Sequence, residues 1–411
     1  MRHRGWVNQM LSRPDTSSAA ATGPLAGIRV VDLSINVLGP VATQILGDMG
    51  ADVIKVETPQ GDPNRDTGPA RHPGMSAMHM NLNRNKRSIT LNLKNPDAKK
   101  ALMRLVETAD VVVHSMRPAA AVRLGISYSD ISAKNDRIIY AYGPGYRQDG
   151  PKKDLPAFDD VVQSESGIAA LMGQVNGEPR YYPTVIIDKF CGYILASSIG
   201  MALFARERTG KGQEVHVPMF ETILSFNYLE HLWGGAFDPP LDPGVGYVRL
   251  LTRHRRPYPT KDGYIGVLAV NDDQWRRMLP ALGRPELVND TRFATTAHRV
   301  RHYDELYGIV AEQLKLKTTA EWYEIFDAID IPNGPMNSLQ DLLHDRYLAE
   351  TGFFHRYTHP TEGPAVTTSV PVHFSETPGS IRLPPPLLGE HNHAVLSELG
   401  YSTAEIHALS T

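Results

Sequence analysis

Short β-rich runs alternate with helical segments from residue 25 to about residue 213. This alternation favours a parallel sheet covered by helices on both faces, so the expected fold class is α/β. Ligands normally bind in such folds at the loops that follow the carboxyl ends of the strands. The expected strands are 28–34, 51–57, 88–93, 110–116 and 137–143, and the loops of interest are 35–40, 58–74, 117–123 and 144–156.

A second region begins near Gly244, where proline and glycine become more frequent. A strand-like run, YIGVLAV, precedes two helical stretches there, which predicts a smaller second domain. The tail from Thr351 is rich in proline and reads as extended before a final helix, HNHAVLSELG.

Charge and cysteine content exclude several classes of protein. The 411 residues carry a formal net charge of −3, which gives no general electrostatic basis for binding nucleic acid or an anionic membrane. Cys191 is the only cysteine, so an internal disulfide and a cysteine-based metal cluster are excluded, as expected of a reducing cytoplasm. No apolar run approaches the ~20 residues of a membrane helix. Residues 1–24 have no apolar signal-peptide centre, and we expect a disordered extension there rather than a transit sequence.

Common cofactor and nucleophile motifs are missing. The turn after the first expected strand reads INVLGP rather than G-x-G-x-x-G, which argues against a nicotinamide or flavin cofactor. The sequence has no Walker loop and no G-x-S-x-G elbow, and its histidines do not stand at metal spacing, so we expect no metal and no tightly bound cofactor. Two basic clusters, RNKR at 84–87 and RHRR at 253–256, either face solvent or bind phosphate or a substrate carboxylate.

The order of longer motifs is much more specific. PLAGIRVVDLS, GPVATQILGDMGADVIKVE, GDPNR, NRNKRSITLNLK, ADVVVHSMRP, RLGISYSDI and GYRQDGP come in this order, followed by RERTGKGQEVHVPMFE, IPNGPMNSLQDLLHD and PLLGEHNHAVLSELGYS. In this order the chain resembles the class III CoA-transferases of the CaiB/BaiF type. That family groups formyl-CoA transferase, carnitine-CoA transferase and α-methylacyl-CoA racemase, and the resemblance extends from Leu25 nearly to the end of the chain.

The resemblance implies a Rossmann-like large domain, a smaller α/β domain and two subunits interlocked as a homodimer. Applied to this chain, it predicts five parts. They are an N-terminal extension at 1–24, the N-terminal part of the large CoA-binding domain at 25–215, a linker at 216–245, the small domain at 246–345, and, at 346–411, a linker with a C-terminal part that returns to the large domain.

The resemblance also assigns residues that bind coenzyme A, which the family takes as acyl-CoA substrate. The strand after NRNKRS offers the backbone of Leu91 and the side chain of Lys94 to the adenine and ribose-phosphate end. Arginine and lysine suit the negative charges of the CoA phosphates. The next strand end and the helix after it add Ser115, Met116, Arg117 and Arg123.

Transferases of this family use an aspartate that forms a mixed anhydride with the acyl group and then an enzyme–CoA thioester. By the resemblance, the acidic position of the formyl-CoA type falls at Asn176, whose amide cannot form an anhydride. The racemase branch pairs a histidine, here replaced by Phe158, with an aspartate that is here Asp188. Asp188 is therefore the predicted catalytic carboxylate, and its alternative role is to cap a helix that begins near Gly192.

The predicted function is transfer of CoA between an acyl-CoA thioester and a small carboxylic acid, through an enzyme-carboxylate intermediate. Asp159 either caps a helix or orients the thioester, and Glu178 is a reserve nucleophile if the loop register shifts. Two alternatives stay open. One is an acyl-CoA racemase or epimerase, against which Phe158 argues, and the other is a CoA-thioester binder without transferase chemistry, which Asn176 would permit. The expected partners are acyl-CoA, a carboxylic acid and a second copy of the chain, with no nucleic acid and no membrane.

Overall fold

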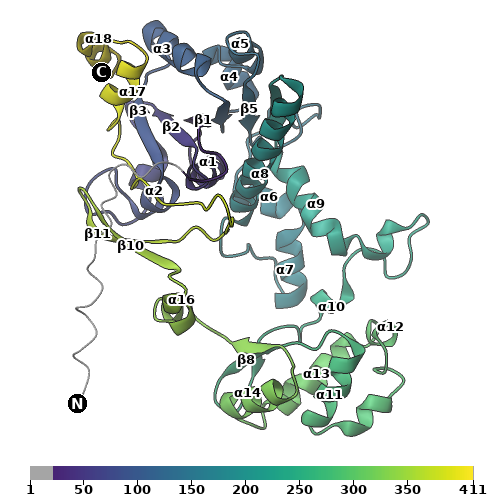
Figure 1. Cartoon of the computed structure of the whole chain (residues 1–411). Coiled ribbons are helices and arrows are strands. Elements are labelled where there is room, and N and C mark those ends of the chain that lie inside the picture. Colours follow the sequence, from purple (N-terminus) through teal and green to yellow (C-terminus); the bar gives the residue numbers. More distant parts are fainter. Residues whose placement is uncertain (1–21, 411) are drawn as a thin grey trace, which may run out of the picture. The chain divides into compact units, whose positions relative to one another are not determined.

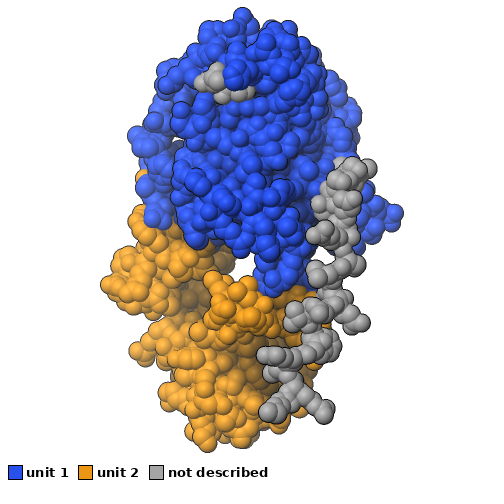
Figure 2. Space-filling view, turned by 90° about the vertical axis from the view of Figure 1, so that its left-hand side faces the viewer, with its two compact units in different colours: residues 1–162, 185–222, 352–411 blue, residues 163–184, 223–351 orange. Residues whose placement is uncertain are grey.

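The computed structural model describes residues 22–410, which fall into two compact units (Figures 1 and 2). The first unit combines the chain up to residue 162 with 185–222 and 352 onward, and the second contains 163–184 and 223–351. Residues 163–184 thus group with the second unit, although the sequence placed them inside 25–215. The other expected boundaries stay predictions. The predicted extension, 1–24, lies outside the described residues except for 22–24.

A six-stranded parallel sheet forms the centre of the first unit, in the order β3-β2-β1-β4-β5-β6. The predicted α/β class and its parallel sheet are therefore confirmed. The chain runs from β1 outward to β3 and then returns to β4 on the other side of β1, so the strand order reverses between β1 and β4. A crevice for ligands is expected at such a reversal. The strands are β1 (Arg29–Leu33), β2 (Asp52–Glu57), β3 (Lys86–Thr90), β4 (Val111–His114), β5 (Ile139–Tyr142) and β6 (Gln213–His216).

The strand β3 begins at Lys86, two residues before the start of the expected strand. Lys86 pairs in register with Val53 of β2 and lies inside the covered sheet. Its charge is compensated by Asp32 of β1, because Lys86 Nζ lies 3.2 Å from Asp32 Oδ2 and both side chains are fully buried. A lysine is not a signal for a buried strand, so the strand predicted from the sequence began only at Ser88.

Helices cover both faces of the sheet (Figure 1). On one face α3, α17 and α18 pack against a core that contains Val31, Ile54 and Ile89. Val30 and Val53 point to the opposite face because successive strand residues alternate. On that face α1 contacts β1 and β2, and α8 contacts β5 and β6. The helices of this unit are α1 (Leu38–Asp48), α2 (Ala77–Leu82), α3 (Pro96–Glu107), α4 (Pro118–Leu124), α5 (Tyr128–Ser132), α8 (Ile186–Thr209), α17 (Asn392–Glu398) and α18 (Thr403–Ser410), with a 3₁₀ turn at Pro63–Asp66.

The longest helix, α8, packs closely on α1. A Cβ atom added to Gly192 would lie only 2.8 Å from the carbonyl oxygen of Leu38, so glycine permits this approach. By length and composition alone the 24 residues of α8 could cross a membrane. Ile187, Leu195 and Ile199 are buried within the unit, so packing in the core accounts for one apolar face of this helix.

The C-terminal segment binds along the first unit. It starts with an antiparallel hairpin of β10 (Phe354–His359) and β11 (Gly363–Thr368), where the sequence predicted only extended chain. Further on, the backbone N–H of Asn85 donates to the carbonyl of Leu383 (3.0 Å), and that of His391 donates to the carbonyl of Ser88 (2.9 Å). These bonds tie the tail to β3, which is an edge strand of the sheet.

The second unit has its own apolar core around Trp275, Leu306, Trp322 and Phe326. A three-stranded antiparallel sheet, ordered β7-β8-β9, lies among its helices. Two helices, α6 (Asp159–Glu165) and α9 (Met219–His231), begin in the first unit and end in the second. The remaining elements are α7 (Ile168–Asn176), a 3₁₀ turn at Trp233–Ala236, α10 (Val248–Leu251), β7 (Tyr258–Pro259), β8 (Tyr264–Val267), α11 (Asp272–Ala281), a 3₁₀ turn at Pro285–Asn289, α12 (Thr296–Arg299), α13 (Tyr303–Leu314), α14 (Thr319–Ala328), β9 (Asn333–Pro335), α15 (Leu339–Leu342) and α16 (Arg346–Glu350).

Replacing Lys86 by Met is expected to destabilise the protein by about 3–5 kcal/mol, because Asp32 then loses a buried partner. Urea unfolding measures the loss. The matched control is Lys100→Met, which removes a pair with Asp97 whose side chains are 73% and 72% exposed. That change should cost less than about 1 kcal/mol. Equal losses in the two variants would contradict the structural role assigned to Lys86.

Candidate active site

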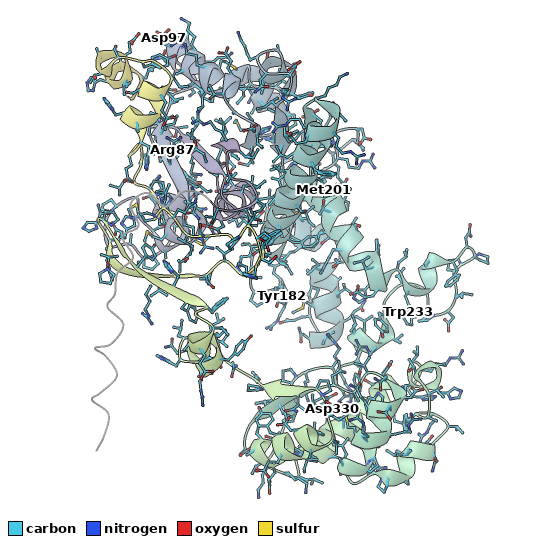
Figure 3. The ribbon with its side chains drawn as sticks, in the orientation of Figure 1. Arg87, Asp97, Tyr182, Met201, Trp233 and Asp330 are labelled. Carbon is cyan, nitrogen blue, oxygen red and sulfur yellow. The ribbon has the colours of Figure 1, made fainter. Side chains whose placement is uncertain are left out.

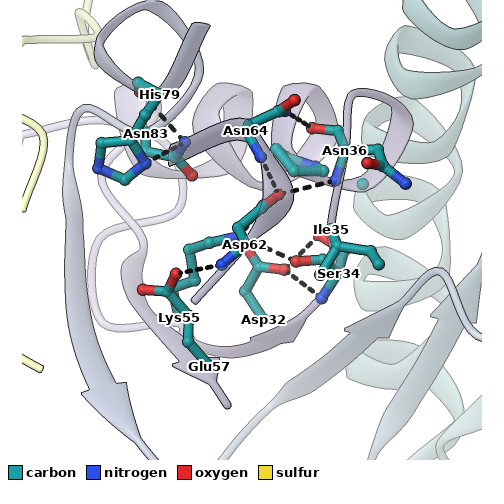
Figure 4. A network of polar contacts seen from close by, with 12 residues as sticks. Asp32, Ser34, Ile35, Asn36, Lys55, Glu57, Asp62, Asn64, His79 and Asn83 are labelled. Atoms are coloured by element: carbon teal, nitrogen blue, oxygen red, sulfur yellow. Dashed lines mark hydrogen bonds and ion pairs between the residues drawn. The ribbon is translucent and has the colours of Figure 1, made fainter. Parts of the chain in front are cut away.

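Polar groups converge at the carboxyl ends of β1 and β4, where the strand order reverses. The backbone N–H of Ile35 donates to Ser115 Oγ (3.0 Å) and so joins the loop after β1 to the loop after β4. The next residue, Asn36, adopts a left-handed backbone with φ of 63°. Its N–H donates to Asp62 Oδ1 (3.2 Å), and its carbonyl accepts from the Asn64 side chain (Figure 4). The loop after β1 is therefore held from both sides.

Buried charges support this loop from below. Lys55 Nζ donates to the carbonyl of Ser34 (2.8 Å) and to Asp62 Oδ2 (2.9 Å), and both charged side chains are fully buried. Asp32 accepts from the N–H of Ser34 (2.9 Å). Burial alone would raise the pKa of Asp32, but Lys86 and Lys55 outweigh it and lower this pKa to about 2. Asp32 is therefore ionised at neutral pH, and the network keeps its charges paired.

The predicted CoA-binding residues of the β4–α4 loop lie together on one short segment. Met116 donates its N–H to His114 Nδ1 (3.1 Å), which fixes the backbone at the strand end. Burial lowers the pKa of His114 to about 4, so this imidazole is neutral and can accept that bond. The guanidinium of Arg117 is exposed and donates to the carbonyl of Asp154 (3.4 Å). Ser115, as described above, binds the loop after β1.

The other predicted CoA-binding residues follow β3 and α4. The Leu91 side chain is only 1% exposed in the core, so its backbone carries any ligand contact. Lys94 and Arg123 are exposed. Arg123 stands in the last turn of α4, just before the left-handed cap residue Gly125. The sheet order separates β3 from β4, so Leu91 and Lys94 belong to a different strand end from Ser115.

Sequence reasoning missed Lys99 of α3. Its Nζ lies 2.1 Å from where a Cβ atom of residue 125 would be, so its ammonium group occupies the space beside the end of α4. This places another cation next to the segment that carries Arg123. The lysine precedes Lys100 in an ordinary amphipathic helix, and no sequence signal distinguishes the two.

The cluster RNKR does not bind phosphate through its cations, Arg84, Lys86 and Arg87, because all three are paired within the protein, so this alternative is wrong. The side chains of Arg84 and Lys86 are buried and pair with Asp48 (2.7 Å) and Asp32 (3.2 Å). Arg87 pairs with Asp52 (2.6 Å) and with Glu398 of the C-terminal helix (2.7 Å). Figure 3 labels Arg87 on β3. These cations therefore hold the large unit together, and none is left for a ligand.

Two aspartates meet at the start of α8. The carboxylate of Asp159, at the start of α6, accepts the backbone N–H of Ile187 (2.8 Å) and of Asp188 (3.1 Å). Asp159 therefore caps α8 from another helix. The alternative role predicted for Asp188, capping a helix near Gly192, is wrong, because α8 begins at Ile186 and Asp188 already lies within its first turn.

Asp188 carries a strongly perturbed carboxyl group. Burial, together with the nearby charge of Asp159, raises the pKa of Asp188 to about 7. The same surroundings raise the pKa of the Cys191 thiol, one turn further along α8, to about 12. The thiol therefore stays protonated and is no competing nucleophile. Gly192, next in the helix, packs on Leu38 at the start of α1, so the turn that carries Asp188 lies beside the loop after β1.

The other positions considered for catalysis, Asn176, Glu178 and Phe158, fit that role poorly. Asn176 is the last residue of α7 and is exposed. Glu178 is exposed and paired with Arg180, whose Nε donates to Glu178 Oε1 (2.9 Å). Phe158 precedes Asp159 and is 67% exposed. Within residues 22–410, no three side chains of His, Cys, Asp or Glu are grouped to hold a metal ion.

The structure thus defines an α/β protein whose parallel sheet reverses its strand order between β1 and β4, with a poorly solvated carboxyl group beside the loop after β1. Residues 25–392 match the model of CoA-transferase family III. The chain belongs to this family and is a class III CoA-transferase.

Named relatives and solved structures agree with this assignment. Succinyl-CoA:glutarate CoA-transferase of Mus musculus is 33% identical over 94% of this chain and 89% of its own length. Succinate–glutarate CoA-transferase of Agrobacterium fabrum is 33% identical over 92% of this chain and 96% of its own length. The crystal structure of Rv3272 from Mycobacterium tuberculosis superposes with a TM-score of 0.79 at 30% identity, over 90% of this chain and 99% of that one.

The raised pKa of Asp188 predicts that Asp188→Asn makes the protein more stable at neutral and alkaline pH. The group ionises at about 7 when folded but near its ordinary value of 3.8 when unfolded. Its ionisation therefore opposes folding increasingly as pH rises from about 4 to 7. Because Asp188 is partly exposed, the gain from asparagine should be about 1–2 kcal/mol near pH 8 and should vanish below about pH 4. Chemical unfolding at both pH values measures it, and equal stability of the two proteins at pH 8 would count against the raised pKa.

Proposed function

We propose that this enzyme moves CoA between two small dicarboxylic acids, with Asp188 as the nucleophile that carries the intermediates. The observation that carries the proposal is the raised pKa of Asp188, which burial and Asp159 together produce. The relatives named for succinate and glutarate support the class of acid. A related crystal structure, 29% identical with a TM-score of 0.81, is that of an aspartate-to-alanine mutant of Rv3272.

The reaction consists of four balanced steps. Ionised Asp188 attacks the thioester carbonyl of the donor and displaces CoA thiolate, which leaves an acyl–Asp188 anhydride. The thiolate then attacks the Asp188 carbonyl, which releases the donor acid and leaves an enzyme–CoA thioester. The carboxylate of the acceptor attacks that thioester and again expels the thiolate. The thiolate finally attacks the acceptor carbonyl, which forms the new acyl-CoA and restores the Asp188 carboxylate.

Repulsion between the two aspartates favours these steps. Ionised Asp188 is held in a poorly solvated place close to Asp159, whose charge is stabilised by two backbone N–H groups. Forming the anhydride or the thioester removes the charge on Asp188 and with it the repulsion. The anhydride and the thioester are therefore stabilised relative to the free carboxylate. Asp159 is a positioning residue in this scheme, because it caps α8 and raises the reactivity of Asp188 without touching substrate.

The nucleotide end of CoA is proposed to bind at the loops of the first unit. Lys94, Arg117 and Arg123 are exposed cations there and suit the CoA phosphates. Lys99 joins them beside the end of α4. The backbone carbonyls of Leu91, Ser115 and Met116 offer acceptors for the adenine amino group, while the N–H groups of Leu91 and Met116 already donate to Glu57 and His114.

A homodimer in the cytoplasm is also proposed. The family resemblance implies two interlocked subunits, and α8 carries large exposed apolar side chains that a second copy could cover. Tyr193, Met201 and Phe204 are 56%, 65% and 64% exposed, which is unusual for one face of a helix, and Figure 3 labels Met201 on α8. Sedimentation of the intact chain would distinguish a dimer from the 45.5 kDa monomer.

Asp188→Ala should lower the rate of CoA transfer from succinyl-CoA to glutarate by at least about 1,000-fold, because the nucleophile is lost. Trapping provides an independent readout. Hydroxylamine added with succinyl-CoA should convert one carboxyl group of the wild type, Asp188, to a hydroxamate that mass spectrometry locates. The wild-type rate should also fall as pH drops below about 7, where Asp188 becomes protonated. Full transfer by Asp188→Ala, or a label on another acid, would overturn the assignment.

Lys99→Met and Arg123→Met should each raise KM for acyl-CoA about 10-fold, because each removes a charge-assisted contact to the CoA phosphates. The effect should largely disappear with thioesters of 3′-dephospho-CoA. The control is Lys100→Met, which removes the same charge from the adjacent, 73% exposed position. An equal effect of Lys100→Met would show general electrostatics instead of a defined phosphate site.

A further inference from the structure

A buried imidazole stands where β4 passes into the segment predicted to bind CoA. His114 is the last residue of β4 and is only 1% exposed. Its Nδ1 accepts the N–H of Met116 (3.1 Å), two residues further along the chain. The side chain thereby closes a turn around Ser115 and orients the peptide groups on either side of it. Asparagine and aspartate side chains commonly form the same kind of turn.

The ring of His114 is fixed by two tyrosines of the neighbouring strand β5. It stacks on Tyr142, with ring centres 4.8 Å apart and ring planes at 12°, and it lies at a tilt against Tyr140, with ring centres 4.9 Å apart. Both tyrosines are buried in the core of the first unit. A ring packed in this way cannot easily turn away from Met116, so the hydrogen bond is preorganised.

The imidazole is also held in the neutral form that accepts a hydrogen bond. Because Nδ1 of His114 accepts, Nε2 carries the ring proton. This Nε2 is buried and has no hydrogen-bond partner among the described residues. A second proton would occupy Nδ1, end the bond to Met116 and place a charge in an apolar core. Burial lowers the pKa of His114 for this reason, to about 4.

The same group of rings reaches the other end of the predicted CoA-binding segment. The hydroxyl of Tyr140 donates to the carbonyl of Ile126 (2.8 Å), directly after the left-handed cap residue Gly125 that ends α4. Arg123 stands two residues before this cap. The strand β5 therefore fixes the loop after β4 through His114 and the end of α4 through Tyr140. All of these residues belong to the first unit.

We propose that His114 is a positioning residue for CoA. Together with Tyr140 it holds residues 115–125 in the conformation that binds the nucleotide, and it does so without touching the substrate. This inference rests on the proposed function, which places CoA on this segment. A segment that is ordered before CoA arrives loses little conformational entropy on binding, so its order raises the affinity. Asp188 lies on another element, α8, and its reaction does not depend on this turn.

Two substitutions separate the hydrogen bond from the packing. His114→Phe keeps a ring between the tyrosines but removes the acceptor, whereas His114→Asn keeps an acceptor for the N–H two residues on but removes the ring. His114→Phe should raise KM for acyl-CoA about fivefold, because one neutral hydrogen bond is lost, and should leave kcat within about twofold in a stably folded protein. His114→Asn should keep KM within about twofold while lowering the unfolding temperature.

A purely structural role would give the opposite order, because CoA affinity would then follow stability. A larger KM for His114→Asn than for His114→Phe, or a wild-type KM in His114→Phe, would overturn the proposal. The matched control is His359→Phe. His359 is a buried histidine of the same unit whose Nδ1 accepts the N–H of Thr361 (3.2 Å), also two residues further on, after β10. This control should lower stability without changing KM for acyl-CoA.

Tyr140→Phe tests the other end of the segment. It leaves the carbonyl of Ile126 without its donor and should loosen the end of α4 next to Arg123. Affinity should fall about threefold for CoA and stay unchanged for 3′-dephospho-CoA. His114→Phe should weaken both ligands equally, because the adenine is proposed to lie at its turn. Unchanged CoA affinity in Tyr140→Phe, or an equal loss with both ligands, would contradict the role given to Tyr140.

Direct binding separates failure of this inference from failure of the proposed function. Calorimetric titration of the intact protein with CoA measures affinity even if no transfer occurs, and Arg123→Met serves as the reference. Weaker CoA binding by Arg123→Met with unchanged binding by His114→Phe would leave the CoA site in place and overturn the role of His114. Unchanged binding in all variants, Arg123→Met included, would overturn the CoA site itself and the positioning role with it.

Discussion

Paired charges sealed inside the large unit hold its ligand-binding edge in place. Lys55 and Lys86 have no access to solvent, and they bind Asp62 and Asp32 at 2.9 and 3.2 Å. Removing one member of such a pair leaves a buried charge without compensation, so the members are retained or lost together. Lys55 also binds the carbonyl of Ser34, and Asp62 binds the N–H of Asn36. The loop after β1 is thus positioned by electrostatics rather than by apolar packing.

The proposed catalysis by Asp188 uses the opposite arrangement, in which two like charges lie close together and repel each other. Asp159 and Asp188 repel each other, and two backbone N–H groups at the N-terminus of α8 bind Asp159 and hold it in place. The network at the strand ends pairs its charges and becomes rigid. The aspartate pair leaves one charge unpaired, and this charge is available for covalent chemistry.

The two units divide the work along the chain. The chain crosses between the units four times, and the first two crossings, after Val162 and before Val185, fall within a few residues of Asp159 and Asp188. The first unit carries the carboxylate pair and the loops proposed for CoA. The second has a separate apolar core around Trp275 and Trp322.

Much of the fold could be predicted because the strands of a sheet covered on both faces are short apolar runs that the sequence shows directly. The alternation of strands and helices, and the order of motifs from PLAGIRVVDLS onward, are local properties that the sequence displays directly. The sequence singled out Asp188 for the same reason, since a motif places it. The errors have a common physical cause. RNKR reads as a ligand site until Asp48, Asp32, Asp52 and Glu398 come beside it from distant segments.

The sequence by itself determined the α/β class, the family and the candidate nucleophile, because these follow from periodicity and from residues close together in the chain. Only the tertiary structure decided which charges are paired and which are free. It showed that Asp159, and not Asp188, caps α8, and that Lys99 lies beside the end of α4. Charge pairing and burial depend on contacts between distant segments, and a linear sequence does not display those contacts.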